Sequence, residues 1–246
     1  MTISAPSETA VATGDLPKRV NFGCGFDRRD GYLNVDFQEV HEPDLLADVR
    51  SLPMLPSGYF DEVLAQDVLE HLERGDVDPA LREWARLLAV GGRLVLRVPD
   101  LIGLARLLAY HDQVADHHKL IQNLYGTQAY TGDFHLSGFT ELTLRASLHD
   151  AGFEVESIER FEDWLFDCVA VRSDALGVFD PGPLPFLAAC DHDPGGRQRR
   201  RLSTRAGTLD RVVTAVANQV PEGPRLRARR AWRPVRRRLV ERGVIQ

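Results

Sequence analysis

Two closely spaced segments, Val20-Asn-Phe-Gly-Cys-Gly25 and Gly31-Tyr-Leu-Asn-Val-Asp36, organise the first part of this sequence. In the first segment the apolar residues Val20 and Phe22 alternate with polar neighbours, which is typical of a β-strand. The glycines that follow allow the backbone to turn sharply and to approach a ligand closely. The second segment predicts another short strand, which ends at the carboxylate of Asp36. This order is typical of an α/β nucleotide site, because the acid can accept both hydrogen bonds of a ribose diol.

The spacing of these residues argues against a nicotinamide or flavin dinucleotide. The dinucleotide fingerprint has a third glycine where this chain has Arg28, and its acid follows about 20 residues later. Only ten residues separate Gly25 from Asp36, which is too few for a complete crossover helix. A two-glycine turn also occurs in proteins that bind nothing there, so this segment alone leaves both interpretations open.

Length and composition predict one good-sized domain with an appendage. The chain has 246 residues, of which 43% are hydrophobic and 27% charged, and no apolar run approaches the length of a membrane span. Its first fifteen residues lack the basic and apolar regions of a signal peptide. The cysteines Cys24, Cys168 and Cys190 are odd in number and lack metal-type spacing. We therefore expect free thiols and a cytoplasmic location.

The net charge of −6 hides an asymmetry between the two ends of the chain. From Arg197 onward there are fifteen arginines and three acidic residues, a local charge of +12 that leaves −18 for the rest. This basic tail has three open interpretations: a helix lying peripherally on an anionic membrane, a nucleic-acid contact, or a solvated or self-docking segment. The membrane interpretation is supported by apolar residues at helical spacing, namely Ala228, Trp232, Val235 and Leu239. Nucleic acid is less favoured, because the body is acidic and no RNA-binding motif is visible.

The order of apolar and turn-forming segments divides the chain into four regions. They are a disordered leader (1–17), a folded domain (18–172), a linker rich in proline, glycine and arginine (173–207), and a basic, partly helical tail (208–246). The expected strands of the domain cover 19–23, 32–36, 44–48, 60–66, 93–98, 153–161 and 164–171.

Four helices are expected between these strands. The first begins at Asp67 with Glu70 completing a capping box, and the second is capped by Asp78 and ended by Gly91-Gly92. The third covers 101–121, and the fourth runs from Thr140 to Gly152. A polar, glycine-bearing connection over 122–138 separates the last two.

The alternation of strands and helices predicts an α/β, Rossmann-like, doubly wound sheet that is mostly parallel and closes with an antiparallel hairpin. Ligands of such sheets bind at the carboxyl ends of the strands. The residues singled out by their chemistry all lie at such ends: Gly23 to Gly25, Asp36, Asp48, Gln66, Asp67 and Asp100.

Several motifs in a fixed order give residues 18–172 a resemblance to the class I S-adenosylmethionine-dependent methyltransferases. The motifs are Asn21-Phe-Gly-Cys-Gly25, Gly31-Tyr-Leu-Asn-Val-Asp36, Leu69-Glu-His-Leu72, Gly91-Gly92 and Pro99-Asp100. The chain is particularly similar to a short subgroup that lacks the crossover helix between the glycine turn and the acid. This resemblance implies S-adenosylmethionine as the methyl donor and a seven-stranded sheet whose last strand is antiparallel.

The resemblance also implies roles for individual residues. In this resemblance the methionine part of the cofactor would be lined by Gly23, Cys24 and Gly25. The ribose would be bound by Asp36 and the adenine by Asp48 and Val49. The amino-acid end of the cofactor would lie near Gln66 and Asp67. For Asp67, capping of the following helix is the alternative. The chain departs from the family at Asn21, where an acid is usual, which puts a contact with the cofactor ammonium in doubt.

The methyl acceptor is expected at the 122–138 connection. His135 is the candidate general base, because methyl transfer to a hydroxyl needs alignment of the acceptor and removal of one proton, and Asp133 could orient the imidazole. A loop-anchoring role for His135 is the open alternative. The further candidate substrate-binding residues are His71, Asp100, Tyr130 and Asp133. No metal cluster is visible in the sequence, so we expect chemistry without a metal.

The predicted function is methyl transfer from S-adenosylmethionine to a hydroxyl of a small molecule or glycan. The alternative is an inactive cofactor-binding module that acts as a membrane- or nucleic-acid-associated scaffold through its basic tail. The oligomeric state and the identity of the acceptor do not follow from the sequence.

Overall fold

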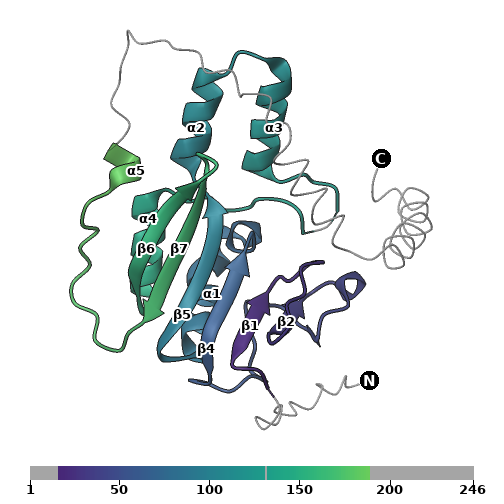
Figure 1. Ribbon diagram of the computed structural model, residues 1–246, viewed down its shortest axis with the longest axis vertical. Helices are drawn as coiled ribbons and strands as arrows, with labels where there is room; N and C mark the ends of the chain where they lie inside the picture. Colours follow the sequence, from purple (N-terminus) through teal and green to yellow (C-terminus); the bar gives the residue numbers. More distant parts are fainter. Residues whose placement is uncertain (1–15, 131, 189–246) are drawn as a thin grey trace, which may run out of the picture. The chain divides into compact units, whose positions relative to one another are not determined.

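The computed structural model describes residues 16–130 and 132–188. In these residues seven strands form one sheet in the order β3-β2-β1-β4-β5-β7-β6 (Figure 1). The strands are β1 (Arg19–Phe22), β2 (Leu33–Asp36), β3 (Leu45–Leu46), β4 (Phe60–Gln66), β5 (Leu88–Pro99), β6 (Phe153–Phe161) and β7 (Leu165–Arg172). Strand β7 runs antiparallel to both of its neighbours, and all other paired strands are parallel. The predicted Rossmann-like sheet with an antiparallel last strand is therefore confirmed.

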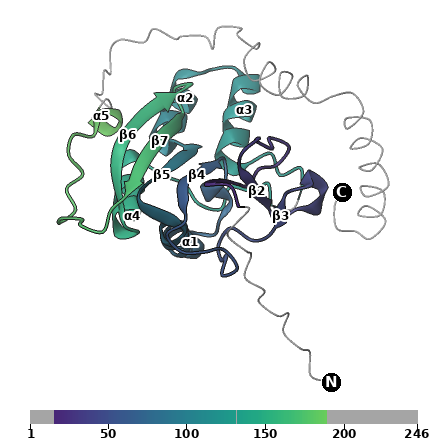
Figure 2. The same cartoon turned by 60° about the horizontal axis from the view of Figure 1, so that its bottom comes forward.

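The helices of the described residues connect these strands. They are the 3-10 turns η2 (Glu39–His41) and η3 (Leu69–His71) and the helices α1 (Arg74–Leu87), α2 (Leu101–Tyr110), α3 (Val114–Tyr125), α4 (Glu141–Asp150) and α5 (Pro185–Ala188). Helices α1 and α4 lie together on one face of the sheet, whereas α2 and α3 project beyond the carboxyl end of β5 (Figures 1 and 2).

The core lies between the sheet and the α1 face. Trp84 of α1 is fully buried and its ring lies 5.5 Å from that of Phe22 on β1. Its indole N–H donates to the carbonyl of Val49 at 2.9 Å, so the one polar atom of this large side chain is satisfied. These contacts fix the central strands and therefore the strand ends that carry the candidate site.

Two of the expected helix starts are wrong. Asp67 begins no helix, since its φ is +56° and only the single turn η3 follows it. Helix α1 begins at Arg74, one turn before the expected cap at Asp78, because the earlier turn buries Val77 in the core.

Two expected helix ends differ as well. Gly91-Gly92 lie inside β5, where the pairing with β4 shifts register between Phe60 and Glu62, and α1 ends earlier at Leu87. The helix expected over 101–121 is divided, because α2 ends at Tyr110 and α3 starts anew at Val114. Strand β4 and the cap of α4 at Thr140 are as predicted, and Thr143 completes a capping box there.

The folded part continues past the expected boundary at residue 172. The Phe186 ring packs 5.7 Å from that of Phe166, and its backbone N–H donates to Glu141 at 3.0 Å. The leader up to residue 15 and the basic tail lie outside the described residues, and so do the predictions made for them. Among the helices of 16–130 and 132–188, none has both the length and the apolar character that a membrane crossing requires.

Candidate functional site

The glycine turn after β1 is bonded directly to the end of β2. Gly23 and Gly25 have φ values of +56° and +50°, which favour glycine. The Gly25 N–H donates to the Asp36 carboxylate at 2.9 Å, and the Cys24 N–H donates to the Val35 carbonyl at 3.1 Å. The turn and the acid recognised in the sequence therefore form one unit.

Asp36 is buried and held as a carboxylate. Burial alone would raise its pKa, but hydrogen bonds from His41 and from the backbone N–H groups of Gln38 and Gly25 outweigh burial, and the pKa lies below its usual value. The Gln38 N–H donates at 2.8 Å and the His41 Nδ1 lies 3.0 Å from the carboxylate. No local pattern in the sequence marks His41, because its approach to Asp36 depends on the turn η2.

The side chain of Asn21 stabilises the loop that follows the glycine turn. Its side-chain amide donates to the Asp27 carbonyl at 2.9 Å and to Asn34 Oδ1 at 3.1 Å, and both asparagines are buried. Arg29, in the same loop, donates to the Gln66 side chain at 2.9 Å. The residue that departs from the family pattern thus has a structural role, and Gln66 is tied to the glycine loop.

The two residues expected at the adenine have partners within the domain. Asp48 accepts hydrogen bonds from the Arg50 guanidinium, the shortest at 2.6 Å, and Arg50 also pairs with Asp76 at 2.6 Å. Val49 is buried, and its carbonyl accepts the bond from Trp84. An adenine contact at Asp48 and Val49 stays a prediction.

Glu70 follows β4 in the turn η3 and is 1% exposed. Its Oε2 has no hydrogen-bond partner among the described residues, although nearly every buried polar atom in a protein has one. Burial, reinforced by the nearby charge of Asp67, raises the pKa of Glu70 well above its usual value. Asp67 itself is exposed to solvent. The carboxyl group of Glu70 is therefore buried with one oxygen left without a partner among the described residues.

The connection after α3 is anchored to η3 largely by backbone hydrogen bonds. The N–H groups of Leu136 and Ser137 donate to the Glu70 carbonyl at 2.8 and 3.0 Å. His71 Nδ1 lies 3.1 Å from the Phe134 carbonyl, to which it donates. As a result His135, far away in the sequence, lies beside His71 with their rings 4.8 Å apart and edge to face.

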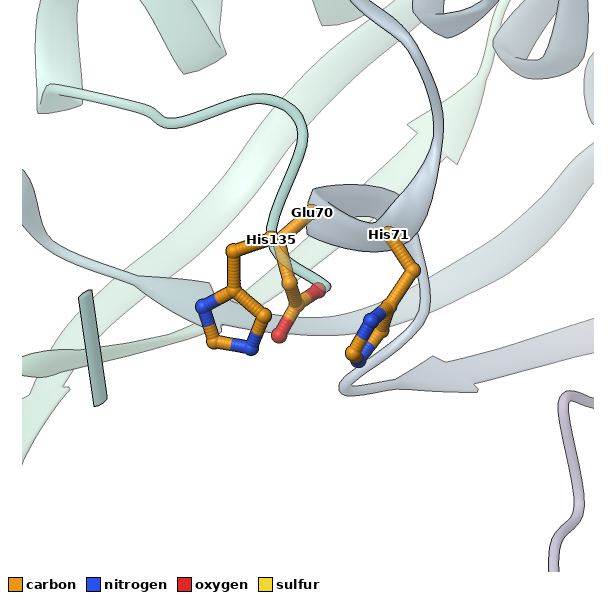
Figure 3. Close-up of side chains that lie close together, drawn as sticks. All are labelled: Glu70, His71 and His135. Carbon is orange, nitrogen blue, oxygen red and sulfur yellow. The ribbon is translucent and has the colours of Figure 1, made fainter. Parts of the chain in front are cut away.

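Figure 3 shows the Glu70 carboxylate between the imidazoles of His71 and His135. One ligand atom from each of these three side chains lies within 4.8 Å of the other two. The sequence predicted no metal cluster, whereas the fold brings together three side chains of metal-binding type. The cluster could not be recognised in the sequence because His135 is far from Glu70 and His71 along the chain.

The two histidines are neutral at pH 7. Burial and the neighbouring His71 lower the pKa of His135 to about 4, against the opposing effect of hydrogen bonding to the backbone of Asn123 and Leu124. Burial likewise lowers the pKa of His71. Each imidazole is therefore a weak base and has an unprotonated nitrogen available.

Asp133 does not orient His135 but holds its own loop. Its carboxylate accepts hydrogen bonds from the Thr127 hydroxyl and from the Ala129 N–H. Burial first, and then the charges of Asp133 and Asp36, raise the pKa of Tyr130. The loop therefore extends from the histidine pair toward the Asp36 side of the site.

Asp100 forms its hydrogen bond and its ion pair with other residues than those described so far. It is fully buried, caps α2 through a bond from the Ile102 N–H at 2.9 Å, and pairs with Arg160. One carboxylate oxygen is bonded to the Ile102 N–H and the other to Arg160, whereas the sequence predicted a contact with substrate.

The sequence of residues 9–96 matches a family described as a methyltransferase domain. The matched part is just over a third of the chain and contains the glycine turn, Asp36, Glu70 and His71, whereas His135 lies beyond it. A comparison with curated protein sequences found no match.

Solved structures with a similar fold include an S-adenosylmethionine-dependent methyltransferase from Mesorhizobium loti, at 19% identity over 63% of this chain and 90% of that one, with a TM-score of 0.45. An S-adenosylmethionine-dependent methyltransferase from Methanosarcina mazei is 18% identical over 63% and 92%, with a TM-score of 0.46. The 1,6-didemethyltoxoflavin-N1-methyltransferase of Burkholderia thailandensis, solved with its substrate and S-adenosylhomocysteine, is 16% identical over 63% and 71%, with a TM-score of 0.43. At these scores the likenesses carry no argument about the reaction of this chain.

Proposed function

We propose that this protein is a methyltransferase that uses S-adenosylmethionine. The family match over residues 9–96 supports methyl transfer as the reaction. The observation that carries the proposal is the bond from Gly25 to the buried carboxylate of Asp36. A close glycine turn and an ionised acid on the next strand suit a cofactor that carries a ribose diol.

The chemistry of these residues fits the cofactor. A Cβ at Gly23 would lie 2.6 Å from Cγ2 of Val68, so the turn has no room for a side chain on that side. The N–H groups of Gly25 and Gln38 donate to the Asp36 carboxylate, and His41 Nδ1 lies 3.0 Å from it, whereas its two oxygens offer about four acceptor positions. The first ribose hydroxyl donates to an acceptor position of the Asp36 carboxylate that is still free. The second ribose hydroxyl replaces His41 as a partner of that carboxylate.

We further propose a hydroxyl of a small molecule or glycan as the methyl acceptor. The acceptor oxygen attacks the methyl carbon of the sulfonium in line, the carbon–sulfur bond breaks, and its electron pair stays on sulfur. The acceptor site is proposed beside Tyr130, His71 and His135. Because the pKa of His135 is about 4, this imidazole alone is a weak base for a hydroxyl proton, and the hydroxyl needs further activation.

Calorimetric titration with S-adenosylhomocysteine tests the cofactor site. We expect one binding site in the full chain, and a loss of affinity of at least about tenfold in Asp36→Ala, since two charge-assisted hydrogen bonds are removed. Asp61→Ala is the matched control, because Asp61 is an exposed acid at the opposite end of β4. Equal affinities of the Asp36 variant and the wild type would overturn the assignment.

Turnover is tested separately with S-adenosylmethionine labelled in its methyl group and a cell extract as the source of acceptors. Labelled product that disappears in Asp36→Ala supports the enzyme. Binding of S-adenosylhomocysteine without labelled product would instead favour the inactive scaffold predicted as the alternative.

A further inference from the structure

We propose that Glu70, His71 and His135 bind a divalent transition-metal ion, and that this ion receives the hydroxyl of the methyl acceptor. The ion site itself rests only on these three side chains. Its role toward the acceptor rests on the proposed methyltransferase function. The chain thus carries a metal centre next to its cofactor site.

The orphaned carboxylate oxygen of Glu70 is the first argument. A buried acceptor without a partner costs roughly 1–3 kcal/mol, so such atoms are normally bonded to protein, water or an ion. Glu70 is 1% exposed, and its Oε2 has no partner among the described residues. The carboxylate lies between the two imidazoles (Figure 3), so a cation there would satisfy it.

The hydrogen bonds of the histidines are the second argument. Histidines that bind a metal almost always donate their other ring N–H to a carbonyl, a carboxylate or water, which fixes the tautomer and aims the free nitrogen. His71 makes this contact through Nδ1 to the Phe134 carbonyl at 3.1 Å, which leaves Nε2 unprotonated. His71 therefore has one ring nitrogen free to bind an ion, and a ring nitrogen of His135 lies within 4.8 Å of its ligand atom.

The distances are close to those of a loaded site. Metal bonds of about 2.1 Å put neighbouring ligand atoms about 3–3.5 Å apart, and here all three ligand atoms lie within 4.8 Å of one another. Small side-chain rotations cover the difference. The backbone is already in position, because Leu136 and Ser137 bond to the carbonyl of Glu70 itself.

The ligand set indicates the kind of ion. Two imidazoles and one carboxylate suit Mn²⁺, Fe²⁺, Co²⁺ or Zn²⁺, whereas Mg²⁺ and Ca²⁺ prefer oxygen ligands throughout. Three protein ligands leave positions open, which is typical of catalytic rather than structural sites. An open position next to a methyl donor is suited to an acceptor oxygen.

The position of the cluster connects it to the cofactor. Val68, two residues before Glu70, fills the space over Gly23 in the glycine turn, so the metal ligands directly follow a segment that lines the turn. Binding to the ion lowers the pKa of the acceptor hydroxyl, and its proton passes to water. The oxygen then attacks the methyl carbon while the bond to sulfur breaks. An ion at this cluster therefore activates the acceptor hydroxyl directly.

Titration of the metal-free full chain with Co²⁺ tests the site, because imidazole ligands give Co²⁺ a characteristic visible absorption. We expect one Co²⁺ per chain in the wild type, and a loss of affinity of at least about 100-fold in Glu70→Gln, His71→Ala and His135→Ala. His118→Ala is the control, since this histidine is exposed on α3 and outside the cluster. Failure of the wild type to bind, or equal binding by the four variants, would overturn the proposal.

Two further measurements separate folding and cofactor binding from metal binding. Electron paramagnetic resonance of bound Mn²⁺ should report two imidazole nitrogens in the wild type and one in His135→Ala, a result that a merely unfolded variant does not give. Asp36→Ala should bind Co²⁺ normally while losing S-adenosylhomocysteine. If S-adenosylhomocysteine does not bind to the wild type but Co²⁺ does, the methyltransferase proposal fails and the metal site stands. If methyl transfer to cell extract persists undiminished with a chelator present, the role of the ion toward the acceptor is refuted.

Discussion

Gly126 controls the position of His135, and its replacement by alanine tests how tightly the loop is built. The residue ends α3 with φ +78° and ψ 168°, a conformation that is essentially restricted to glycine and costs other residues about 1–3 kcal/mol. A Cβ at this position would also lie 2.2 Å from the carbonyl oxygen of Asp133. Overpacking of this kind costs typically another 1–3 kcal/mol, so Gly126→Ala should lose about 2–6 kcal/mol of stability or displace the loop.

Gly58→Ala is the matched control for this experiment. Gly58 also has a positive φ, +64°, but a Cβ there would meet nothing within 4 Å. Its replacement should therefore cost only the backbone strain, about 1–2 kcal/mol, partly offset by the stiffer unfolded chain. Urea unfolding of both variants measures the difference, and Co²⁺ titration reports displacement of His135. Equal stability of the two variants, together with unchanged Co²⁺ binding by Gly126→Ala, would refute the reasoning.

Three further changes have defined outcomes. Because the pKa of Asp36 is lowered in the folded state, its contribution to stability is complete above about pH 4, the pKa of the unfolded chain. This contribution is lost as the pH falls through the lower pKa of the folded state. The advantage of wild type over Asp36→Asn in thermal melts should therefore shrink in that acid range and not above it. Asp100→Asn leaves the half-buried guanidinium of Arg160 without its acid and should cost about 3 kcal/mol in urea unfolding, whereas a loss below about 1 kcal/mol would contradict a structural ion pair. Phe186→Ala removes the ring packed on Phe166 and should lower stability by about 1–2 kcal/mol, and no change would show that this segment does not contribute.

The parallel half of the fold is predictable because its signals are local. Alternation in β1, the glycine turn and the acid of Asp36 each lie within a few residues, and each is where the sequence indicates. The cap of α4 at Thr140 belongs to the same group. The helix start expected at Asp78 is wrong because burial of Val77 in an earlier turn outweighs a capping preference worth only about 1 kcal/mol.

The candidate site also has a part with local signals, which could be predicted, and a part that depends on distant residues, which could not. The Gly25–Asp36 contact could be expected from strand neighbours, since parallel strands bring their carboxyl ends together. The cluster of Glu70, His71 and His135 could not, because it depends on where a loop of irregular backbone crosses the turn η3. The contact of His41 with Asp36 depends on a turn in the same way, and Asp133 and Asp100 have hydrogen-bond or ion-pair partners within the fold.

The loop that brings His135 to the site is attached mainly by main-chain atoms. Two backbone N–H groups, of Leu136 and Ser137, donate to the carbonyl of Glu70, and such bonds do not depend on which side chains the loop carries. Side chains of this loop other than Thr127 and Asp133 can therefore change without detaching it from η3. A protein built in this way can acquire a new acceptor by exchanging one short segment, while the methyl-donor half stays as it is.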